Sequence, residues 1–587
     1  MKKIILDVET YRNFFLINVE NYHTRKRHSM ILTNGVFSQE DKKLIQHILT
    51  ECEIVTFNGS NYDLPMLSGA FHNYDNQRLK ALSDLLISDD IRVWDVLKDQ
   101  RLALPDNMTH VDLMAIAPGK ASLKLYGARI NTKKLQDLPF EPDKTLTDQE
   151  MNEVIKYCWN DIGLIRELHD ELIQQIELRH SINSEYGINV LAKSDPQIAE
   201  SIIKNRLNYP SIKRIDMRGT CFNLKLKEFH PKLSTEIFKV NEHGKPEFPE
   251  WLKKEKIIVG KGQYKLGLGG LHSMEKNQIV DQLDIYNIDH PMCISDIDVT
   301  SFYPEIICRD KLIPLGLNEN FVTEYIDVKD TRIKAKRENK NIIANSLKIV
   351  LNGTFGKFGS PYSIFYSPQN LIHVTITGQL ALLQLIEAME ANNIEVVSAN
   401  TDGIVCLYPE KLRGVFCDVQ AQWMHSQKFS LEETQYRKVV SRDVNNYIAV
   451  KLNGDVKRKG CFATRNLQKN PDRQVIYDAV CEYVVNGTLV SDYIRSETNP
   501  FKFVKVRTVS GGAMYGNEYA GKVTRYYHST KSDKCLTYKK NGNKVPLSQN
   551  CKPLLDVDGL PDDIDYQVYI DEAMKILKSM KRREYGI

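Results

Sequence analysis

Two acidic residues near the start of the chain are spaced so that both can face one cation. Asp7 and Glu9 lie two positions apart in an apolar run, and side chains two apart on a β-strand point to the same face. Carboxylate oxygens are the ligands that hard cations such as Mg²⁺ accept. Acids make up 75 of the 587 residues, so chance alone gives about ten such pairs, and this pair needs supporting context.

A second group of chemically capable residues lies in the middle of the chain. Asp298 follows an apolar run, and Asp402 lies 104 residues further on. Between them, three residues spaced i, i+4 and i+7 put a cation, an amide and an aromatic ring on one helix face. They are Lys348, Asn352 and Phe355.

Hydrophobic periodicity predicts the elements that hold these residues. Strands are expected where apolar residues run together between turn signals, and helices where they recur every three or four positions. Strands are expected at 3–8, 54–57 and 292–297, hairpins at 394–408 and 447–460, and helices at 147–176, at 566–581 and twice between 327 and 353. Strands followed by helices in the first third predict a compact α/β domain.

The composition excludes several classes of protein. With 79 basic and 75 acidic residues the formal net charge is +4, and 42% of residues are apolar, which argues against a disordered or fibrous chain. No apolar run approaches the ~18 residues of a membrane-spanning helix. Asp7 and Glu9 interrupt the N-terminal apolar stretch before a signal-peptide core can form. We therefore expect a cytoplasmic protein, and its 11 cysteines without a C-x-x-C pair argue against a disulfide framework or a zinc ribbon.

Three motifs of the first third resemble, in order, those of the proofreading 3′→5′ exonuclease domain of family B DNA polymerases. The motifs are Asp7-x-Glu9, Asn58 through Asp63, and Tyr157-x-x-x-Asp161. The resemblance implies that the four carboxylates of these motifs hold two Mg²⁺ or Mn²⁺ ions, one of which lowers the pKa of an attacking water. It also implies that Tyr157 orients this water. Asn58 would hold the terminal nucleotide, and Lys124 would neutralise the scissile phosphate. The alternative is four surface acids on a structural domain.

The central residues resemble motifs A, B and C of the polymerase domain of the same family. The three segments are Asp298 through Pro304, Lys348 through Gly356, and Ser398 through Gly403. The resemblance implies that two further ions are held by Asp298, the carbonyl of Val299 and Asp402. Tyr303 would exclude a 2′-hydroxyl group. The residues implied to bind the incoming dNTP are Tyr303, Lys348, Asn352, Phe355, Arg332, Lys336 and Lys340. For the last three a solvated helix face is an equal alternative.

This chain departs from the family pattern at several positions. Phe355 stands where the family has Tyr, Gly353 where it has Ser, and Asn400 where motif C has its first Asp. The missing charge at Asn400 is expected to weaken metal affinity or fidelity. Asp296 can face the same side as Asp298, but the register of motif A favours Asp298 as the ligand.

Other segments are implied to hold DNA. Asn446-Tyr447 and Lys457 through Gly460 resemble the family's primer-gripping hairpin, which assigns Tyr447, Lys457 and Lys459 to the primer strand or the template edge. Gly269 and Gly270 resemble a linker that guides the template. The segment 525–528 fits either a thumb on the duplex backbone or an ordinary half-buried strand.

The implied fold class is α/β multidomain, with an RNase H-like exonuclease domain followed by a right-hand polymerase around an antiparallel palm sheet. The implied domains are 1–180 (exonuclease), 181–290 (linking region), 291–325 (palm), 326–356 (fingers), 357–465 (palm) and 466–587 (thumb).

The implied function is a DNA-templated DNA polymerase with a proofreading exonuclease, of the short type found in phages and plasmids. Its partners would be primer–template DNA, dNTPs, single-stranded DNA at the exonuclease site and accessory replication proteins; it would act as a monomer, without a membrane, in the host cytoplasm. Only 44 residues separate Tyr303 from Lys348, which favours a nucleic-acid primer over a terminal protein. Two alternatives remain open: an exonuclease whose polymerase half has decayed, and a non-catalytic single-stranded DNA-binding protein.

Overall fold

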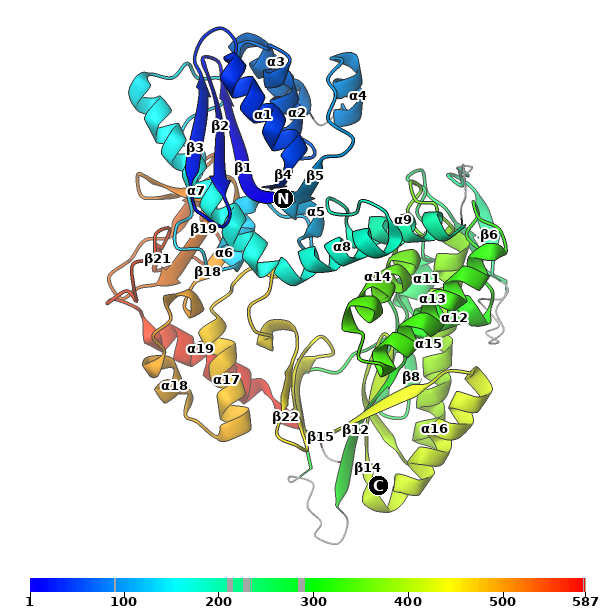
Figure 1. The fold of residues 1–587 in the computed structure, drawn as a ribbon. Coiled ribbons are helices and arrows are strands. Elements are labelled where there is room, and N and C mark those ends of the chain that lie inside the picture. The colour runs from blue at the N-terminus through cyan, green and yellow to red at the C-terminus, as the bar shows by residue number, and fades with distance from the viewer. Residues whose placement is uncertain are drawn as a thin grey trace. The chain divides into compact units, whose positions relative to one another are not determined.

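The computed structural model describes residues 1–88, 91–207, 215–224, 233, 235–282, 291–583 and 585. They form a mixed α/β chain of two compact units (Figure 1), which agrees with the predicted class at that level. The first unit comprises 1–194, 465–475 and 495–569, and the second comprises 195–464, 476–494 and 570–587. The predicted domain boundary at residue 290 lies outside the described residues.

A five-stranded sheet in the order β3-β2-β1-β4-β5 forms the centre of the first unit. β1 runs antiparallel to β2 and parallel to β4. Ile4 and Leu6 pack on one face of β1 and Ile5 on the other, because successive strand side chains point to opposite faces. The strands are β1 (Lys2–Tyr11), β2 (Phe14–Asn21), β3 (Arg27–Leu32), β4 (Cys52–Thr56) and β5 (Thr109–Asp112).

Helices cover both faces of this sheet. Residues of the first helices share a core with Leu6, whereas Ile162 and Ile165 of α7 share one with Ile5. The expected helix at 147–176 is interrupted at Leu172, where the φ/ψ of −98°/9° leaves the helical region. The helices are α1 (Gln39–Glu51), α2 (Asp63–Phe71), α3 (Asn76–Leu86), α4 (Val93–Asp99), α5 (Leu113–Ile116), α6 (Leu123–Arg129), α7 (Asp148–Glu171) and α8 (Ile173–Tyr186).

A second sheet of the first unit comes from the C-terminal part of the chain. Its order is β20-β18-β19-β21, and Val509, Ala513 and Tyr526 lie in its apolar core. The strands are β18 (Lys505–Tyr515), β19 (Glu518–His528), β20 (Leu536–Tyr538) and β21 (Cys551–Pro553).

The second unit is organised around a largely antiparallel sheet in the order β17-β16-β15-β12-β14-β13-β10-β9-β8. β12 lies in its middle, between β14 and β15. The expected strand at 292–297 and both expected hairpins are confirmed. The strands of this path are β8 (Ile257–Val259), β9 (Gly262–Lys265), β10 (His272–Ser273), β12 (Met292–Val299), β13 (Glu395–Asn400), β14 (Gly403–Pro409), β15 (Leu431–Asp443), β16 (Asn446–Lys451) and β17 (Val456–Arg458).

Helices pack against this sheet and against one another. The two helices expected between 327 and 353 are α13 and α14, separated near residue 339. The helices of this unit include α9 (Asp195–Leu207), α12 (Phe302–Arg309), α13 (Asn320–Arg337), α14 (Asn341–Lys357), α15 (Pro368–Ala391) and α16 (Arg413–Gln427). In the C-terminal part, α19 (Tyr566–Ser579) matches the helix expected at 566–581.

The long helix α15 was not predicted. It is long and apolar enough to cross a membrane by composition alone, and 72% of its most apolar window is buried inside the structure. That burial is typical of a core helix. The helix contains no uninterrupted apolar run of ~18 residues, because uncharged polar residues such as Thr375 and Gln379 interrupt its apolar residues without adding charge.

Candidate active sites in the two units

Asp298 lies near the end of β12, and Asp402 lies in the turn between β13 and β14, directly before the strand that pairs with β12. Asp298 pairs with Gly403, and the backbone N–H of Val299 donates to the carbonyl oxygen of Asp402 at 2.7 Å. A Cβ atom on Gly403 would lie 2.1 Å from Asp298 Oδ1, so this carboxylate occupies the space that any other side chain would need. Both aspartates line a pocket of about 460 Å³.

The local electrostatics suit a bound cation. Both carboxylates are reached by solvent through the pocket, yet partial desolvation raises the pKa of Asp298 to about 6, with the charge of Asp296 adding to the effect. Desolvation also raises the pKa of Asp402. Neighbouring carboxylates that repel one another are stabilised in their charged form by a divalent cation. The donor set therefore fits Mg²⁺ or Mn²⁺. Val299, in contrast, is buried and lines neither this pocket nor the next.

A second pocket, of about 400 Å³, adjoins the first through Asp402. The Tyr303 and Phe355 rings lie 4.4 Å apart, centroid to centroid. Arg332 Nη1 donates to Ser301 Oγ at 2.9 Å. The lining residues of this pocket are Ser301, Phe302, Tyr303, Pro304, Arg332, Lys348, Leu351, Asn352, Phe355, Thr401 and Asp402.

Two of the expected nucleotide contacts lie elsewhere. Lys336 and Lys340 do not line the pocket; they form exposed ion pairs with Glu432 at 3.6 Å and with Glu338 at 2.8 Å. Lys336 and Lys340 thus lie on a solvated face of α13 and the following turn, which was the alternative interpretation. Arg332, one helical turn before Lys336, does line the pocket.

The glycine-rich segment 267–270 contacts two residues that line this pocket, Tyr303 and Thr401. The Tyr303 hydroxyl donates to the carbonyl of Gly269 at 2.9 Å. Gly270 has a φ of 140°, and a Cβ there would lie 2.9 Å from the Cα of Thr401. Gln379 of α15 accepts from the N–H of Gly267 at 2.7 Å and donates to its carbonyl at 3.0 Å. Gln379 thus fixes the segment that touches Tyr303.

The residues expected to grip the primer line the pocket that holds Asp298. Tyr447, Lys457 and Lys459 are all among its lining residues. Lys457 Nζ donates to Asp296 Oδ2 at 3.1 Å, and the Tyr436 hydroxyl donates to the same oxygen at 2.7 Å. Asp296 is therefore engaged by two donors, whereas Asp298 faces the pocket.

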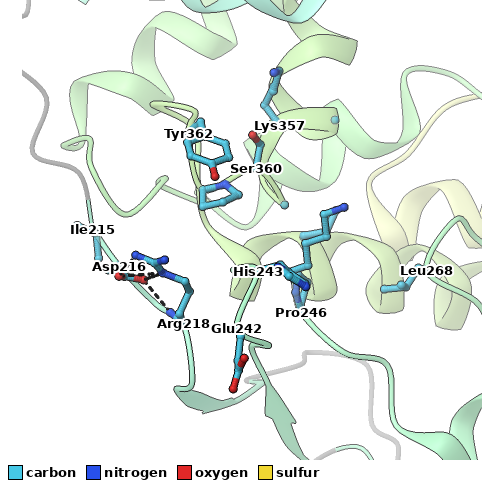
Figure 2. A pocket seen from close by; sticks show the side chains of 15 residues that line it. Ile215, Asp216, Arg218, Glu242, His243, Pro246, Leu268, Lys357, Ser360 and Tyr362 are labelled. Carbon is cyan, nitrogen blue, oxygen red and sulfur yellow. Dashed lines mark hydrogen bonds and ion pairs between the residues drawn. The ribbon is translucent and has the colours of Figure 1, made fainter. Parts of the chain in front are cut away.

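A larger pocket of about 950 Å³ lies beyond the C-terminal end of α14 (Figure 2). Asp216 and Arg218 pair at 2.6 Å on one side of it. Lys245 and Lys357 also line it, and Tyr362, whose residue surface is 82% exposed, lies on its rim. Leu268 is a further lining residue, so this pocket borders the same glycine-rich segment that contacts Tyr303.

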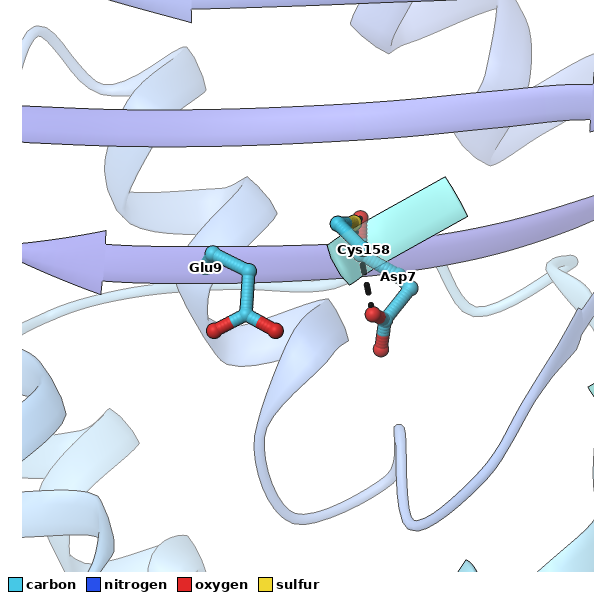
Figure 3. A group of neighbouring side chains, drawn as sticks. All are labelled: Asp7, Glu9 and Cys158. Atoms are coloured by element: carbon cyan, nitrogen blue, oxygen red, sulfur yellow. Dashed lines mark hydrogen bonds between the residues drawn. The ribbon is translucent and has the colours of Figure 1, made fainter. Parts of the chain in front are cut away.

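In the first unit, Asp7 and Glu9 of β1 share a cluster with Cys158 of α7 (Figure 3). One ligand atom from each of these three side chains lies within 4.8 Å of the others. The Cys158 thiol donates to Asp7 Oδ2 at 3.4 Å. Asp63, the first residue of α2, accepts from the N–H of Val8 at 3.2 Å. The acids at 7, 9 and 63 thus surround one stretch of β1.

Charge repulsion and burial dominate this cluster. Burial raises the pKa of Asp7 to about 7, with the charge of Asp161 as the next cause. Burial also raises the pKa values of Glu9 and Asp63 well above their usual range, with the charge of Asp7 as the next cause for each. Burial raises the pKa of Asp161 as well, so the four carboxylates form a donor set that a divalent cation fits.

The remaining predicted residues of this unit surround the acids. Lys124 forms an ion pair with Asp161, and its ammonium lies 4.4 Å from the centre of the Tyr157 ring. Asn58 has a φ of 65°, and its N–H donates to Asp112 Oδ1 at 2.8 Å. Asp112, at the end of β5, also accepts from the N–H of Ser60 at 3.1 Å, so it fixes the loop that carries Asn58.

Arg525 lies in β19 and is a structural residue of the first unit. Its side chain is fully buried and donates to the carbonyls of Thr132, Lys133, Leu554 and Leu555. The half-buried strand is therefore the correct one of the two interpretations for this segment, with Arg525 fixing loops within the first unit.

Comparisons with known proteins give one relative that is similar enough to place the chain in a family. No family model matches the chain. The uncharacterized mitochondrial protein ymf34 of Marchantia polymorpha is 37% identical over 71 residues, which cover 12% of this chain and 89% of ymf34. The chain belongs to the same family as ymf34. Because the name of ymf34 states no activity, belonging to this family assigns no function to the chain.

Two DNA polymerases also show similarity to the chain. DNA polymerase 1 of Aeropyrum pernix is 23% identical over 199 residues, which are 31% of this chain, and the chain spans only about a fifth (20%) of that polymerase's length. The structure of the family B DNA polymerase of Pyrobaculum calidifontis covers 100% of this chain and 78% of its own, at 12% identity and a TM-score of 0.43. This structural similarity is too low to support an assignment.

Three residues of these sites escaped the sequence analysis as site residues. Asp112 is the last residue of β5, a short strand parallel to β4, and its place at the strand end was a usable signal. Cys158 adjoins Tyr157 on α7, and because consecutive helix residues point in different directions, the spacing of Tyr157 and Asp161 gave no signal for it. Gln379 lies in the helix that was missed and pairs with a segment more than 100 residues away in sequence, so no local pattern could identify it.

Proposed function

We propose that this protein is a DNA-templated DNA polymerase that adds dNTPs to a primer 3′-OH. The observation that carries the proposal is the position of Asp402, which lines both the pocket of Asp298 and the pocket of Lys348, Asn352 and Phe355. A catalytic carboxylate pair thus borders a cavity with a cation for a triphosphate and an aromatic ring for a base. Two Mg²⁺ ions, when bound, would activate the primer hydroxyl and stabilise the leaving pyrophosphate.

The residues of the chain would divide the remaining work. Lys348 and Arg332 would neutralise the triphosphate. Tyr303, fixed through its hydroxyl to Gly269, would lie under the sugar and discriminate against a 2′-hydroxyl. Lys459 would contact the primer strand from the other pocket.

The larger pocket beyond α14 would bind the DNA template. Lys245 and Lys357 would pair with backbone phosphates, and the exposed ring of Tyr362 would stack on an unpaired base. In this assignment the second unit is a right-hand polymerase with β12 in the palm and α13 and α14 in the fingers.

A second activity, 3′→5′ exonuclease, is favoured by the acid cluster of the first unit. Asp7, Glu9, Asp63 and Asp161 would hold two ions when these are bound. Tyr157 would orient the attacking water, and Lys124 would neutralise the phosphate. The first unit would then be an RNase H-like proofreading domain acting on single-stranded DNA ends, within a monomeric replicative enzyme of a phage or plasmid.

A primer-extension assay tests the polymerase proposal. The full chain is incubated with a labelled DNA primer on DNA and on RNA templates, with dNTPs, with and without Mg²⁺. The proposal predicts extension that requires Mg²⁺ and is faster on DNA. Mg²⁺-dependent digestion without extension would indicate an exonuclease with a decayed polymerase half. Neither activity, with binding that EDTA does not change, would indicate a single-stranded DNA-binding protein.

A further inference from the structure

The pocket of Asp298 and Asp402 contains two more carboxylates that the motifs leave without a role, Asp443 and Asp296. Asp443 accepts from the side-chain amide of Asn446 at 2.8 Å. Asp296 lies on β12 two residues before Asp298, lines the same pocket and is 7% exposed. A buried carboxylate next to two others adds repulsion to the site. Such a cost indicates either a compensating positive charge or a use for the negative one.

The compensating charge is Lys457. Its ammonium donates to Asp296 Oδ2 at 3.1 Å, and the Tyr436 hydroxyl holds the same oxygen at 2.7 Å. The rings of Tyr436 and Tyr447 flank this ammonium at 5.9 and 5.8 Å from its nitrogen. Lys457 therefore donates to Asp296 and not to Asp298 or Asp402. Without Asp296, the same ammonium would pair with Asp298 or Asp402 and compete with any cation there.

The position that carries a carboxylate in the resembled motif is uncharged in this chain. The Asn400 amide donates to the carbonyl of Val444 at 3.3 Å and to Asn445 Oδ1 at 3.4 Å. This amide is engaged by the turn that follows β15, and it brings no negative charge to the pocket that it lines.

Strand register relates the two positions. Asn400, Gly403 and Asp298 form one row across β13, β14 and β12, and Ser398, Val405 and Asp296 form another row, two residues along. Residues two apart on a strand, and residues directly opposite each other, share a face of the sheet. Asp296 and Asn400 therefore both face the site, from its two sides.

We propose that Asp296 supplies the negative charge that position 400 lacks, so that Lys457 is neutralised and Asp298 and Asp402 remain available to divalent cations. The inference rests on the polymerase function proposed for this pocket. Asp296 acts through Lys457 and is a positioning residue.

The test measures Mn²⁺ binding by the full chain, from the electron paramagnetic resonance signal of unbound Mn²⁺. All proteins carry Glu9→Ala, which removes a carboxylate from the cluster of the first unit, and the chain with this change alone is the parent. The variants are Asp296→Asn, Asp296→Asn with Asn400→Asp, and Asp296→Asn with Lys457→Met. Asp455→Asn is the control, because Asp455 is an exposed acid 3.7 Å from Lys451 at the other end of the same hairpin.

The proposal predicts that Asp296→Asn weakens Mn²⁺ binding about tenfold, because one negative charge is lost near the ion. Both double variants restore binding to within about threefold of the parent, since each returns the net charge of the pocket to its starting value. The control does not change it. The Mg²⁺ concentration for half-maximal primer extension follows the same order.

Two results would overturn the proposal. One is Mn²⁺ binding by Asp296→Asn equal to that of the parent. The other is that both double variants bind Mn²⁺ as weakly as Asp296→Asn or more weakly. That result would indicate a structural role for Asp296, since Lys457→Met would then add damage instead of restoring the charge balance. Thermal melting of each variant shows whether the fold is kept. A further variant tests the proposed function itself. If introducing Asp298→Asn into the parent does not change Mn²⁺ binding, and if the parent extends no primer, the proposed function fails.

Discussion

At the scale of single residues, the glycine beside the catalytic pair offers a direct test of the site. Gly403→Ala would place a Cβ atom 2.1 Å from Asp298 Oδ1, which forces the carboxylate to move. We expect single-nucleotide insertion to fall by a factor of about 100, in line with the cost of small misplacements at active sites. Some stability is lost as well, because the same Cβ would lie 3.0 Å from the backbone oxygen of Ile297.

Gly414→Ala is the matched control for this substitution. Gly414 lies in α16, with nothing within 4 Å of its Cβ position. Alanine there stabilises the helix by up to about 1 kcal/mol and leaves insertion unchanged. Equal insertion rates for the two variants would show that the Asp298 position has no part in catalysis.

Separate sites predict separable losses. Asp7→Ala with Glu9→Ala should abolish digestion of single-stranded DNA and spare primer extension, because these acids belong to the first unit and Asp402 to the second. Asp402→Ala should do the reverse. Gel assays of both activities on both proteins check this, and loss of both activities in either variant would argue against two sites.

At the scale of elements, Gln379 connects α15 to the segment that contacts Tyr303. Gln379→Leu removes both hydrogen bonds to Gly267, and unpaired backbone groups cost about 1–3 kcal/mol each. We expect a lower urea midpoint together with a raised KM for dNTPs. A lower midpoint with an unchanged KM would show that the glycine-rich segment does not position Tyr303.

The second sheet of the first unit depends on Arg525. Arg525→Ala leaves several carbonyls unpaired and should lower the unfolding free energy by about 3 kcal/mol or more. Lys522→Ala, at an exposed position of the same strand, should change it by less than about 0.5 kcal/mol. The salt dependence of DNA binding should stay the same for both variants. A shallower salt slope for Arg525→Ala would restore Arg525 as a phosphate contact.

A buried carboxylate in the same part of the chain gives a pH dependence. Burial alone would raise the pKa of Asp563, but hydrogen bonds from Lys552, Ser529 and Tyr527 lower it to about 2. Because the folded pKa is depressed, this stabilisation is complete above the ordinary value of 3.8 and is lost as the pH falls towards 2.

Urea unfolding between pH 7 and pH 2 measures this effect. Asp563→Asn should lose about 2 kcal/mol at pH 7 and show a flatter acid limb than the parent. Parallel acid limbs for the two proteins would show that Asp563 is not the group responsible.

At the scale of the whole molecule, the sequence predicted what local pattern can encode. The strand at 292–297, both hairpins and the break between α13 and α14 are confirmed, because alternation, turn residues and helical spacing are local signals. The helix α15 was missed because uncharged polar residues blur its apolar pattern. A half-buried strand was one of two open interpretations for 525–528, but the full burial of Arg525 was not predicted, because carbonyls distant in sequence define it.

The candidate sites divide in the same way. Residues within one motif, such as Lys348, Asn352 and Phe355, line one pocket, since helical spacing alone puts them on one face. The difference between Arg332 and its neighbours Lys336 and Lys340 depends on where α13 begins and how it packs, which charge pattern does not show.

The central claim, that Asp298 and Asp402 act together in nucleotide addition, is tested most directly by single-turnover insertion of one dNTP in Mg²⁺. The measurement compares the unaltered chain with Asp298→Asn and Asp402→Asn. The account predicts insertion by the unaltered chain and a loss of at least about 1,000-fold in each variant. Insertion by either variant at the rate of the unaltered chain would contradict it.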